Sequence, residues 1–213
     1  SMAAVVQFTF NPFQENTFIV YDDTRECIII DPGCYTAAER KELSDYINKE
    51  GLSPVKLLNT HAHIDHIFGN RFVYDSYGLL PEMHAGEVPV LESAPQVSAF
   101  FGVSYPDPSP APEHLIEAGE IISFGNTQLL SLYTPGHSPA SLSFFCEADR
   151  FVLAGDVLFY GSIGRTDLPG GNYNTLINSI TTVLMPLGDD VQVYSGPGPA
   201  TSIGYERRHN PFL

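Results

Sequence analysis

Residues 60–66 read Thr60-His61-Ala62-His63-Ile64-Asp65-His66, and they follow an apolar run, residues 55–59, that is typical of a buried strand. His61 and His63 are two positions apart, so at a strand end their side chains point the same way. Asp65 and His66 follow on the turn and can reach a second point nearby. Because imidazole and carboxylate groups are ligands of zinc and similar divalent cations, this stretch predicts a metal site.

Two further polar residues follow predicted strands. His137 ends the segment Thr134-Pro135-Gly136-His137, after an apolar run at residues 127–133, and Gly155-Asp156 follows residues 151–154. A carboxylate directly after a buried strand costs free energy unless its charge is compensated, and a cation would do that. Taken singly, the histidine could be solvated and the aspartate could cap a helix or a turn. Together they place ligand groups at the ends of adjacent strands.

The rest of the chain alternates between strand-like and helix-like patterns. Strands are predicted at residues 5–10, 17–21, 26–30, 55–59, 120–124, 127–133, 141–146, 151–154 and 191–194. Helices are predicted at residues 37–50, 69–77, 87–101 and 174–184, and none in the Gly- and Pro-rich residues 196–213. Residues 105–112 hold four prolines and predict a stiff surface segment. This order predicts a mixed α/β (α+β) domain with helices packed on sheet faces.

Composition excludes several kinds of protein. Of 213 residues, 43% are hydrophobic and only 16% are charged, which is typical of a globular chain. Ten Lys and Arg against 25 Asp and Glu leave a formal charge of −15, which disfavours nucleic acid and anionic membranes as partners. No apolar run approaches the ~20 residues of a membrane span. No secretion signal opens the chain.

Three cysteines, Cys27, Cys34 and Cys146, are too few for a disulfide framework, and an odd number fits a reducing compartment. We therefore expect a cytoplasmic location. Cys27 and Cys146 lie in apolar runs and are predicted to be core residues.

These motifs resemble the metallo-β-lactamase superfamily, whose H-x-H-x-D-H signature matches residues 61–66 and whose next two motifs match residues 134–137 and 155–156. Residues 11–17 and Ile30-Asp31-Pro32-Gly33 resemble the opening strands of glyoxalase II-like hydrolases. Residues 155–171 and the closing Asn210-Pro211-Phe212 resemble the short members of that group. The resemblance implies a four-layer αββα sandwich over residues 1–213, a single domain without the C-terminal helical domain that holds glutathione.

The resemblance also implies a ligand set. The first metal takes His61, His63 and His137, the second takes Asp65, His66 and a further histidine, and Asp156 bridges the two. The further histidine lies in a Gly-His-Gly-Pro turn, which here reads Gly196-Pro197-Gly198-Pro199. Proline offers no lone pair, so water could fill the gap, one ion could be lost, or His209 could move in. We expect one or two zinc ions, with iron or manganese as alternatives.

The activity that the resemblance implies is hydrolysis of a small-molecule thioester of the hydroxyacylglutathione (S-lactoylglutathione) type. Metal-activated water attacks the thioester carbonyl, and Asp65 orients the nucleophile. Tyr160, Ser162 and Arg165 are candidate substrate contacts, although pairing with Asp167 is the favoured interpretation of Arg165. Asp31 is expected to brace its turn, and it either supports the metal site as well or is an ordinary turn aspartate. The oligomeric state stays open.

Other functions are weighed against this one. Persulfide dioxygenases share the fold and hold one iron with two histidines and one aspartate, here His61, His137 and Asp156, and the loss at Pro197 favours them. A silenced paralogue with an incomplete metal site is the non-enzyme alternative. A β-lactamase matches the remaining motifs less well, and a nuclease is disfavoured by the charge of −15.

Overall fold

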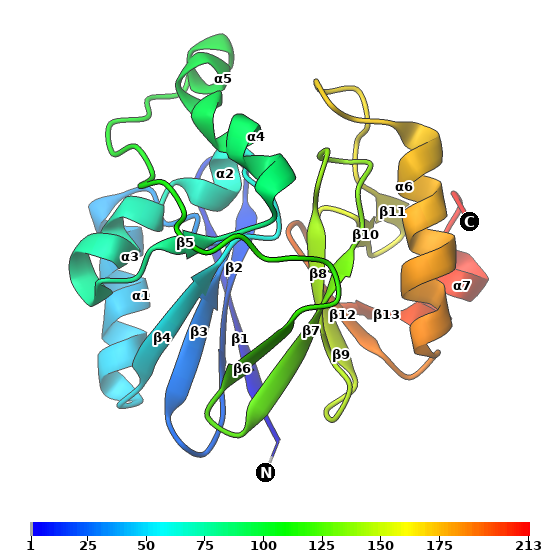
Figure 1. The fold of residues 1–213 in the computed structure, drawn as a ribbon, viewed down its shortest axis with the longest axis horizontal. Helices are drawn as coiled ribbons and strands as arrows, with labels where there is room; N and C mark the ends of the chain where they lie inside the picture. Colours follow the sequence, from blue (N-terminus) through cyan, green and yellow to red (C-terminus); the bar gives the residue numbers. More distant parts are fainter. Residues whose placement is uncertain (1) are drawn as a thin grey trace.

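Two β-sheets face each other between two outer layers of helices in the computed structural model, which describes residues 2–213 (Figure 1). The first sheet has the order β1 (Ala4–Phe10), β2 (Glu15–Tyr21), β3 (Glu26–Ile30), β4 (Ser53–Leu58) and β5 (Pro81–Glu82). The second has the order β13 (Thr201–Ser202), β12 (Gln192–Ser195), β9 (Phe151–Gly155), β8 (Leu142–Cys146), β7 (Thr127–Tyr133) and β6 (Ile121–Phe124). A small hairpin, β10 (Leu158–Phe159) and β11 (Ser162–Ile163), lies apart.

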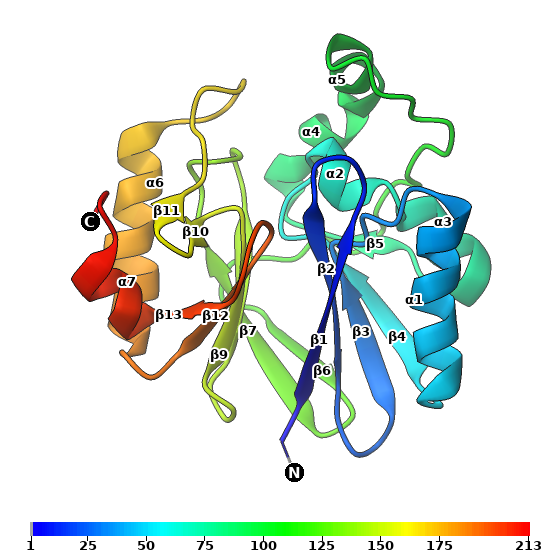
Figure 2. The ribbon, with the colours of Figure 1, turned by 180° about the vertical axis from the view of Figure 1, so that it is seen from behind.

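Helices cover the outer faces of both sheets (Figures 1 and 2). The first sheet carries α1 (Ala37–Lys49) and α3 (Asn70–Tyr77). The second carries α6 (Tyr173–Ser179), which continues into a π-helical turn (Ile180–Leu184) and a 3-10 turn (Met185–Leu187), and α7 (Ile203–His209). A third group lies at one edge: α2 (Ile64–Ile67), a 3-10 turn (Ala85–Glu87), α4 (Val88–Glu92) and α5 (Ala94–Phe100). The expected αββα sandwich is confirmed.

Alternation along the strands explains why the sheets stack this way. In β2, Phe18 and Val20 face the second sheet, whereas Ile19 between them packs toward α1. In β9, Leu153 faces the first sheet, whereas Val152 packs toward α6. Side chains two apart in a strand share a face, so strands that are apolar at every position bury both faces. Each sheet therefore has a core on either side.

Strand direction gathers the predicted site residues at one edge. β7 and β9 both run antiparallel to β8, and β12 runs parallel to β9, so β7, β9 and β12 end at the same edge of the second sheet. The residues after β4 in the first sheet arrive at that edge too, because Leu142 N–H donates to Thr60 C=O. Four chain segments distant in sequence therefore meet above the sandwich.

The structure differs from the sequence prediction at the helix predicted for residues 87–101 and in the tail. The helix predicted at residues 87–101 is two helices that meet at Ser93, with a proline in the first turn of each, because proline fits there and not in a helix interior. The tail, where no helix is predicted, holds α7, which begins with the Ser202 side chain accepting from Tyr205 N–H. At seven residues it is too short for its periodicity to show in sequence. Among residues 2–213, no helix combines the length and apolar character that crossing a membrane requires.

Candidate metal centre

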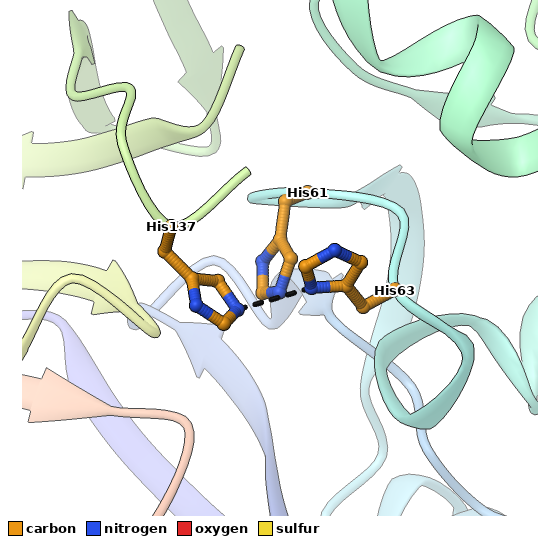
Figure 3. Close-up of side chains that lie close together, drawn as sticks. All are labelled: His61, His63 and His137. Carbon is orange, nitrogen blue, oxygen red and sulfur yellow. Dashed lines mark hydrogen bonds between the residues drawn. The ribbon is translucent and has the colours of Figure 1, made fainter. Parts of the chain in front are cut away.

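Three histidines converge at the sheet edge (Figure 3). His61 and His63 lie on the loop after β4, and His137 lies on the loop after β7. His63 Nδ1 is 3.0 Å from His137 Nε2, and one ring nitrogen from each of the three lies within 4.8 Å of the others. Nitrogens held about 2.0–2.1 Å from a tetrahedral zinc are separated by about 3.3 Å. The first group of predicted ligands is thus brought together.

Hydrogen bonds fix which nitrogen of His137 and of His61 faces the centre. His137 Nδ1 is 2.8 Å from the Arg165 carbonyl oxygen, which can only accept, so Nδ1 carries the proton and Nε2 keeps its lone pair. Thr60 Oγ1 donates to Asp31 and so can accept from His61 Nδ1, 3.0 Å away. His61 Nε2 therefore also presents a lone pair.

Asp65, His66 and Asp156 form a second group beside the first. Asp65 and His66 lie on α2, and Asp156 follows β9. His66 Nε2 is 3.2 Å from Asp156 Oδ1 and 3.5 Å from Asp65 Oδ2. The other Asp156 oxygen, Oδ2, is 3.4 Å from His137 Nε2 and 3.7 Å from His61 Nε2. Asp156 therefore faces both groups with one oxygen each.

Unpaired polar atoms test whether this arrangement fits a metal. His61 Nε2, His66 Nε2 and Asp156 Oδ1 are buried and have no hydrogen-bond partner within residues 2–213. The large majority of buried polar atoms in proteins do have a partner. His66 Nε2 lies 3.2 Å from Asp156 Oδ1 and His61 Nε2 lies 3.7 Å from the other oxygen of the same carboxylate, and imidazole nitrogens and carboxylate oxygens are zinc and iron ligands. The donor set therefore fits a divalent cation.

Burial and charge set the protonation of the ligands. Burial lowers the pKa of His61 well below its usual value and that of His63 to about 3, so both rings are neutral and able to bind a cation. Burial acts against a charge on His66 as well, but the carboxylates of Asp156, Asp65 and Asp31 raise its pKa well above the ordinary value. Burial opposes the ionisation of Asp156, yet His66 and His137 hold its pKa well below the usual range.

Glu87 ties the two halves of the first group together. Its carboxylate is fully buried and accepts from Ala62 N–H at 2.9 Å, between His61 and His63. It also accepts from Ser138 Oγ at 2.7 Å and from Ala140 N–H at 2.8 Å, just after His137. One side chain therefore spans the two ligand loops. The sequence singles out neither Glu87 nor Glu15, a second buried acid, 3.5 Å from His66 Nδ1.

The turn that carries Pro197 lies against the second group. A Cβ atom on Gly196 would come 2.0 Å from Asp156 Oδ1, so only glycine fits there. Asn16 holds the turn by donating from Nδ2 to the carbonyls of Ser195 and Gly198. Pro197 follows Gly196 directly, so it lies next to the ligands, but its side chain has no atom that can bind a metal. His209 lies on α7 with its ring 4.8 Å from Tyr205, and belongs to none of these groups.

The candidate substrate contacts divide in the structure. Arg165 lines a cavity of about 660 Å³ that His63 also lines, and it pairs with Asp167 at 2.7 Å, as one interpretation of the sequence expected. Tyr160 instead stacks on Tyr205, and Ser162 lies in the β10–β11 hairpin. Neither residue lines that cavity.

The cysteines are confirmed as buried, and burial raises the pKa of Cys27 and of Cys34 to about 12. Their thiols are therefore protonated and poorly suited to nucleophilic attack.

Comparison with known proteins agrees with this geometry. The family model described as the metallo-beta-lactamase superfamily matches residues 10–196. The Haemophilus influenzae hydroxyacylglutathione hydrolase GloC is 36% identical over 202 residues, which cover 94% of this chain and 93% of the relative.

Two solved structures have nearly the same fold. The BLEG-1 B3 metallo-beta-lactamase superposes with a TM-score of 0.91 at 35% identity, covering 99% of both chains. TTHA1623 in a di-iron-bound form superposes with a TM-score of 0.88 at 34% identity, covering 98% of this chain and 100% of the other.

Proposed function

Because the chain belongs to the metallo-β-lactamase superfamily, we propose that it is a metal-dependent hydrolase that cleaves small-molecule thioesters of the hydroxyacylglutathione type. The observation that carries this proposal is the pair of adjacent ligand groups that both face Asp156. In these groups His61 Nε2, His66 Nε2 and Asp156 Oδ1 are buried and have no hydrogen-bond partner among the described residues. The relationship to GloC, a hydroxyacylglutathione hydrolase, supports the choice of substrate class.

His61, His63 and His137 would hold one ion, and Asp65, His66 and Asp156 would hold or share a second. A bound divalent ion supplies Lewis acidity and a water whose pKa is lowered toward neutrality. We take zinc as the leading candidate. The di-iron-bound relative keeps iron as an alternative, and manganese stays a prediction from the sequence.

The chain's own groups then position the reactants. Asp65 lies on α2 at the second group, and burial raises the pKa of its carboxyl, so it is suited to orient the attacking water and to accept a proton from it. The water oxygen bonds to the acyl carbon, the C–S bond breaks, and the proton leaves with the thiolate. Because thiolate is a good leaving group, a dedicated acid is not required.

A mononuclear iron enzyme is the second candidate. Asp156 Oδ2 lies 3.4 Å from His137 Nε2 and 3.7 Å from His61 Nε2, so two histidines and one carboxylate already converge, and Pro197 weakens the second group. Two histidines and a carboxylate suit an oxygen-activating iron. Persulfide oxidation is the activity to test for it. The B3 metallo-beta-lactamase neighbour adds β-lactam hydrolysis as a control reaction.

The deciding experiment measures metal per chain by inductively coupled plasma mass spectrometry on protein purified without added metal, and S-lactoylglutathione turnover on the same sample. Close to two zinc-like ions with turnover supports the hydrolase. One iron without turnover contradicts it and moves the test to oxygen uptake with a persulfide. One ion with neither activity favours a silenced paralogue. The cytoplasmic location stays a prediction from cysteine usage.

A further inference from the structure

An open apolar groove borders the metal centre, because His63, one of the predicted ligands, is among its lining residues. It has a volume of about 660 Å³, which is in the range of small-molecule sites. One wall is the pair of helices α4 and α5 at the top of Figure 1, and the other is the loop of residues 165–169. A substrate whose carbonyl lies at the ligands can place a neighbouring group in this groove, because His63 belongs to both.

Both walls contribute apolar side chains to the groove. Apolar side chains dominate the lining: Pro89, Val90, Val97, Phe100, Phe101, Leu168 and Pro169. Phe100 is 84% exposed and Phe101 is 38% exposed, although aromatic rings of this size normally gain free energy from burial. Exposed apolar surface that continues into a catalytic cleft marks a ligand groove rather than a random surface patch.

Charge argues against an anionic occupant. Among the described residues that line the groove, Arg165 alone carries a positive charge. Its guanidinium is already paired with both carboxylate oxygens of Asp167, at 2.7 and 2.9 Å. The chain as a whole carries a formal charge of −15. A substrate with free carboxylates, as glutathione has, would meet no unpaired cation there.

The groove is anchored to the metal centre through its loop wall. The Arg165 carbonyl oxygen accepts from His137 Nδ1, so the residue that opens this wall also orients a predicted ligand. His63 likewise belongs to both sites, with Nδ1 in the first group and the residue in the lining of the groove. A group seated in the groove therefore borders one of the predicted ligands.

We propose that this groove receives the acyl group of the thioester, and that this group is a bulky aliphatic or aromatic one without a free carboxylate. The inference rests on the proposed function and deepens it, because it replaces the small lactoyl group by an apolar acyl group as the preferred substrate. The thiol carrier then extends toward solvent on the other side of the ligands.

The test compares three substrates with the metal-loaded protein: the phenylacetyl and acetyl thioesters of N-acetylcysteamine, and S-lactoylglutathione. One added methylene in an apolar site is worth about 10–200-fold in kcat/KM. We expect kcat/KM to be at least about tenfold higher for the phenylacetyl thioester than for the other two.

Two variants test whether the groove causes the preference for the phenylacetyl thioester. Phe100→Ser and Phe101→Ser should each lower kcat/KM for the phenylacetyl thioester about five- to tenfold and change that for the acetyl thioester less than about twofold. Ile121→Ser is the matched control, since Ile121 is 51% exposed on β6, outside the groove. Circular dichroism checks that all three variants are folded.

The outcomes are separable. A preference for S-lactoylglutathione, or a phenylacetyl preference that neither phenylalanine variant changes, overturns the groove assignment and leaves thioester hydrolysis standing. If no thioester is cleaved, the proposed function fails. Calorimetry then tests whether the groove binds the uncharged ketone analogue of the phenylacetyl thioester, in which a methylene replaces the sulfur. Binding that Phe100→Ser weakens supports the groove, and no binding overturns it.

Discussion

The Asp31 carboxylate accepts a hydrogen bond from His66 Nδ1 at 2.9 Å and lies behind both groups of the metal centre. It also accepts from Thr60 Oγ1, which in turn is positioned to accept from His61 Nδ1. One buried carboxylate thereby holds Nδ1 of His66, and through Thr60 Nδ1 of His61, away from the centre, so that Nε2 of each ring faces it. These contacts favour a role for Asp31 in supporting the site over that of an ordinary turn aspartate.

Asp31→Asn should weaken metal binding about 10–100-fold. Asparagine tolerates the left-handed backbone of this position, where φ is 51°, so the fold should survive. Its amide nitrogen would donate toward His66 Nδ1 and force the ring proton onto Nε2, the atom needed for the cation. Competition with a chromophoric chelator measures the affinity. Asp45→Asn, on the exposed face of α1, is the control, and equal affinities for both variants would contradict the role of Asp31.

Glu87→Gln should lower the free energy of unfolding by about 1–3 kcal/mol. The glutamine amide would place a donor against the N–H of Ala62 or of Ala140, which the carboxylate now accepts from. Because these residues adjoin the ligands of the first group, metal affinity should fall as well. Urea denaturation and chelator competition measure the two effects. Glu92→Gln on α4 is the matched control, since Glu92 is exposed. If Glu87→Gln lowers the free energy of unfolding no more than Glu92→Gln does, Glu87 does not link the two loops.

Pro197→His should restore a nitrogen at the second group. The turn lies against Asp156 and His66 at Gly196, so a histidine at the next position starts close to both. We expect the metal content to rise toward two ions per chain and the second ion to bind at least about tenfold more tightly. Mass spectrometry of metal content and chelator competition measure these changes. Pro199→His, two positions further along the same tail, controls for an added surface histidine. Unchanged stoichiometry in Pro197→His would show that the position cannot reach the site.

Asp22→Asn should destabilise the fold at neutral pH and less so in acid. Burial raises the pKa of Asp22, but hydrogen bonds from Thr24, Thr127 and Asn126 outweigh it and hold the pKa below the usual value. The ionised carboxylate therefore stabilises the folded state above the unfolded-state pKa of about 3.9, and that contribution is lost as the pH falls through the folded-state pKa.

The loss in Asp22→Asn should be about 1–3 kcal/mol at pH 7, because Asp22 joins the β2–β3 turn to the β6–β7 turn across the two sheets. It should shrink toward zero below about pH 3. Urea denaturation at a series of pH values measures it. Asp23→Asn, at the exposed next position, should show no such trend, and a pH-independent loss in Asp22→Asn would speak against this role.

Much of the fold and the site was predictable because the relevant signals are local. Continuous runs of apolar residues identify β2 and β9, and the spacing of His61, His63, Asp65 and His66 is a property of six consecutive residues. His137 and Asp156 follow predicted strands, so their convergence with that stretch follows from strand ends meeting at one sheet edge. Local spacing is enough to identify ligands when the backbone geometry of each segment is regular.

The tertiary structure alone decided how the site is supported and what approaches it. Glu87 lies 25 residues from Ala62 and 53 from Ala140, so nothing in its own sequence neighbourhood reveals that it joins their loops. The apolar groove is likewise shared between α4–α5 and residues 165–169, which are more than 60 residues apart in the sequence. Such contacts depend on how segments distant in the sequence pack against one another. Burial sets the free-energy cost and the strength of each polar contact, and a residue is buried only after those segments have packed.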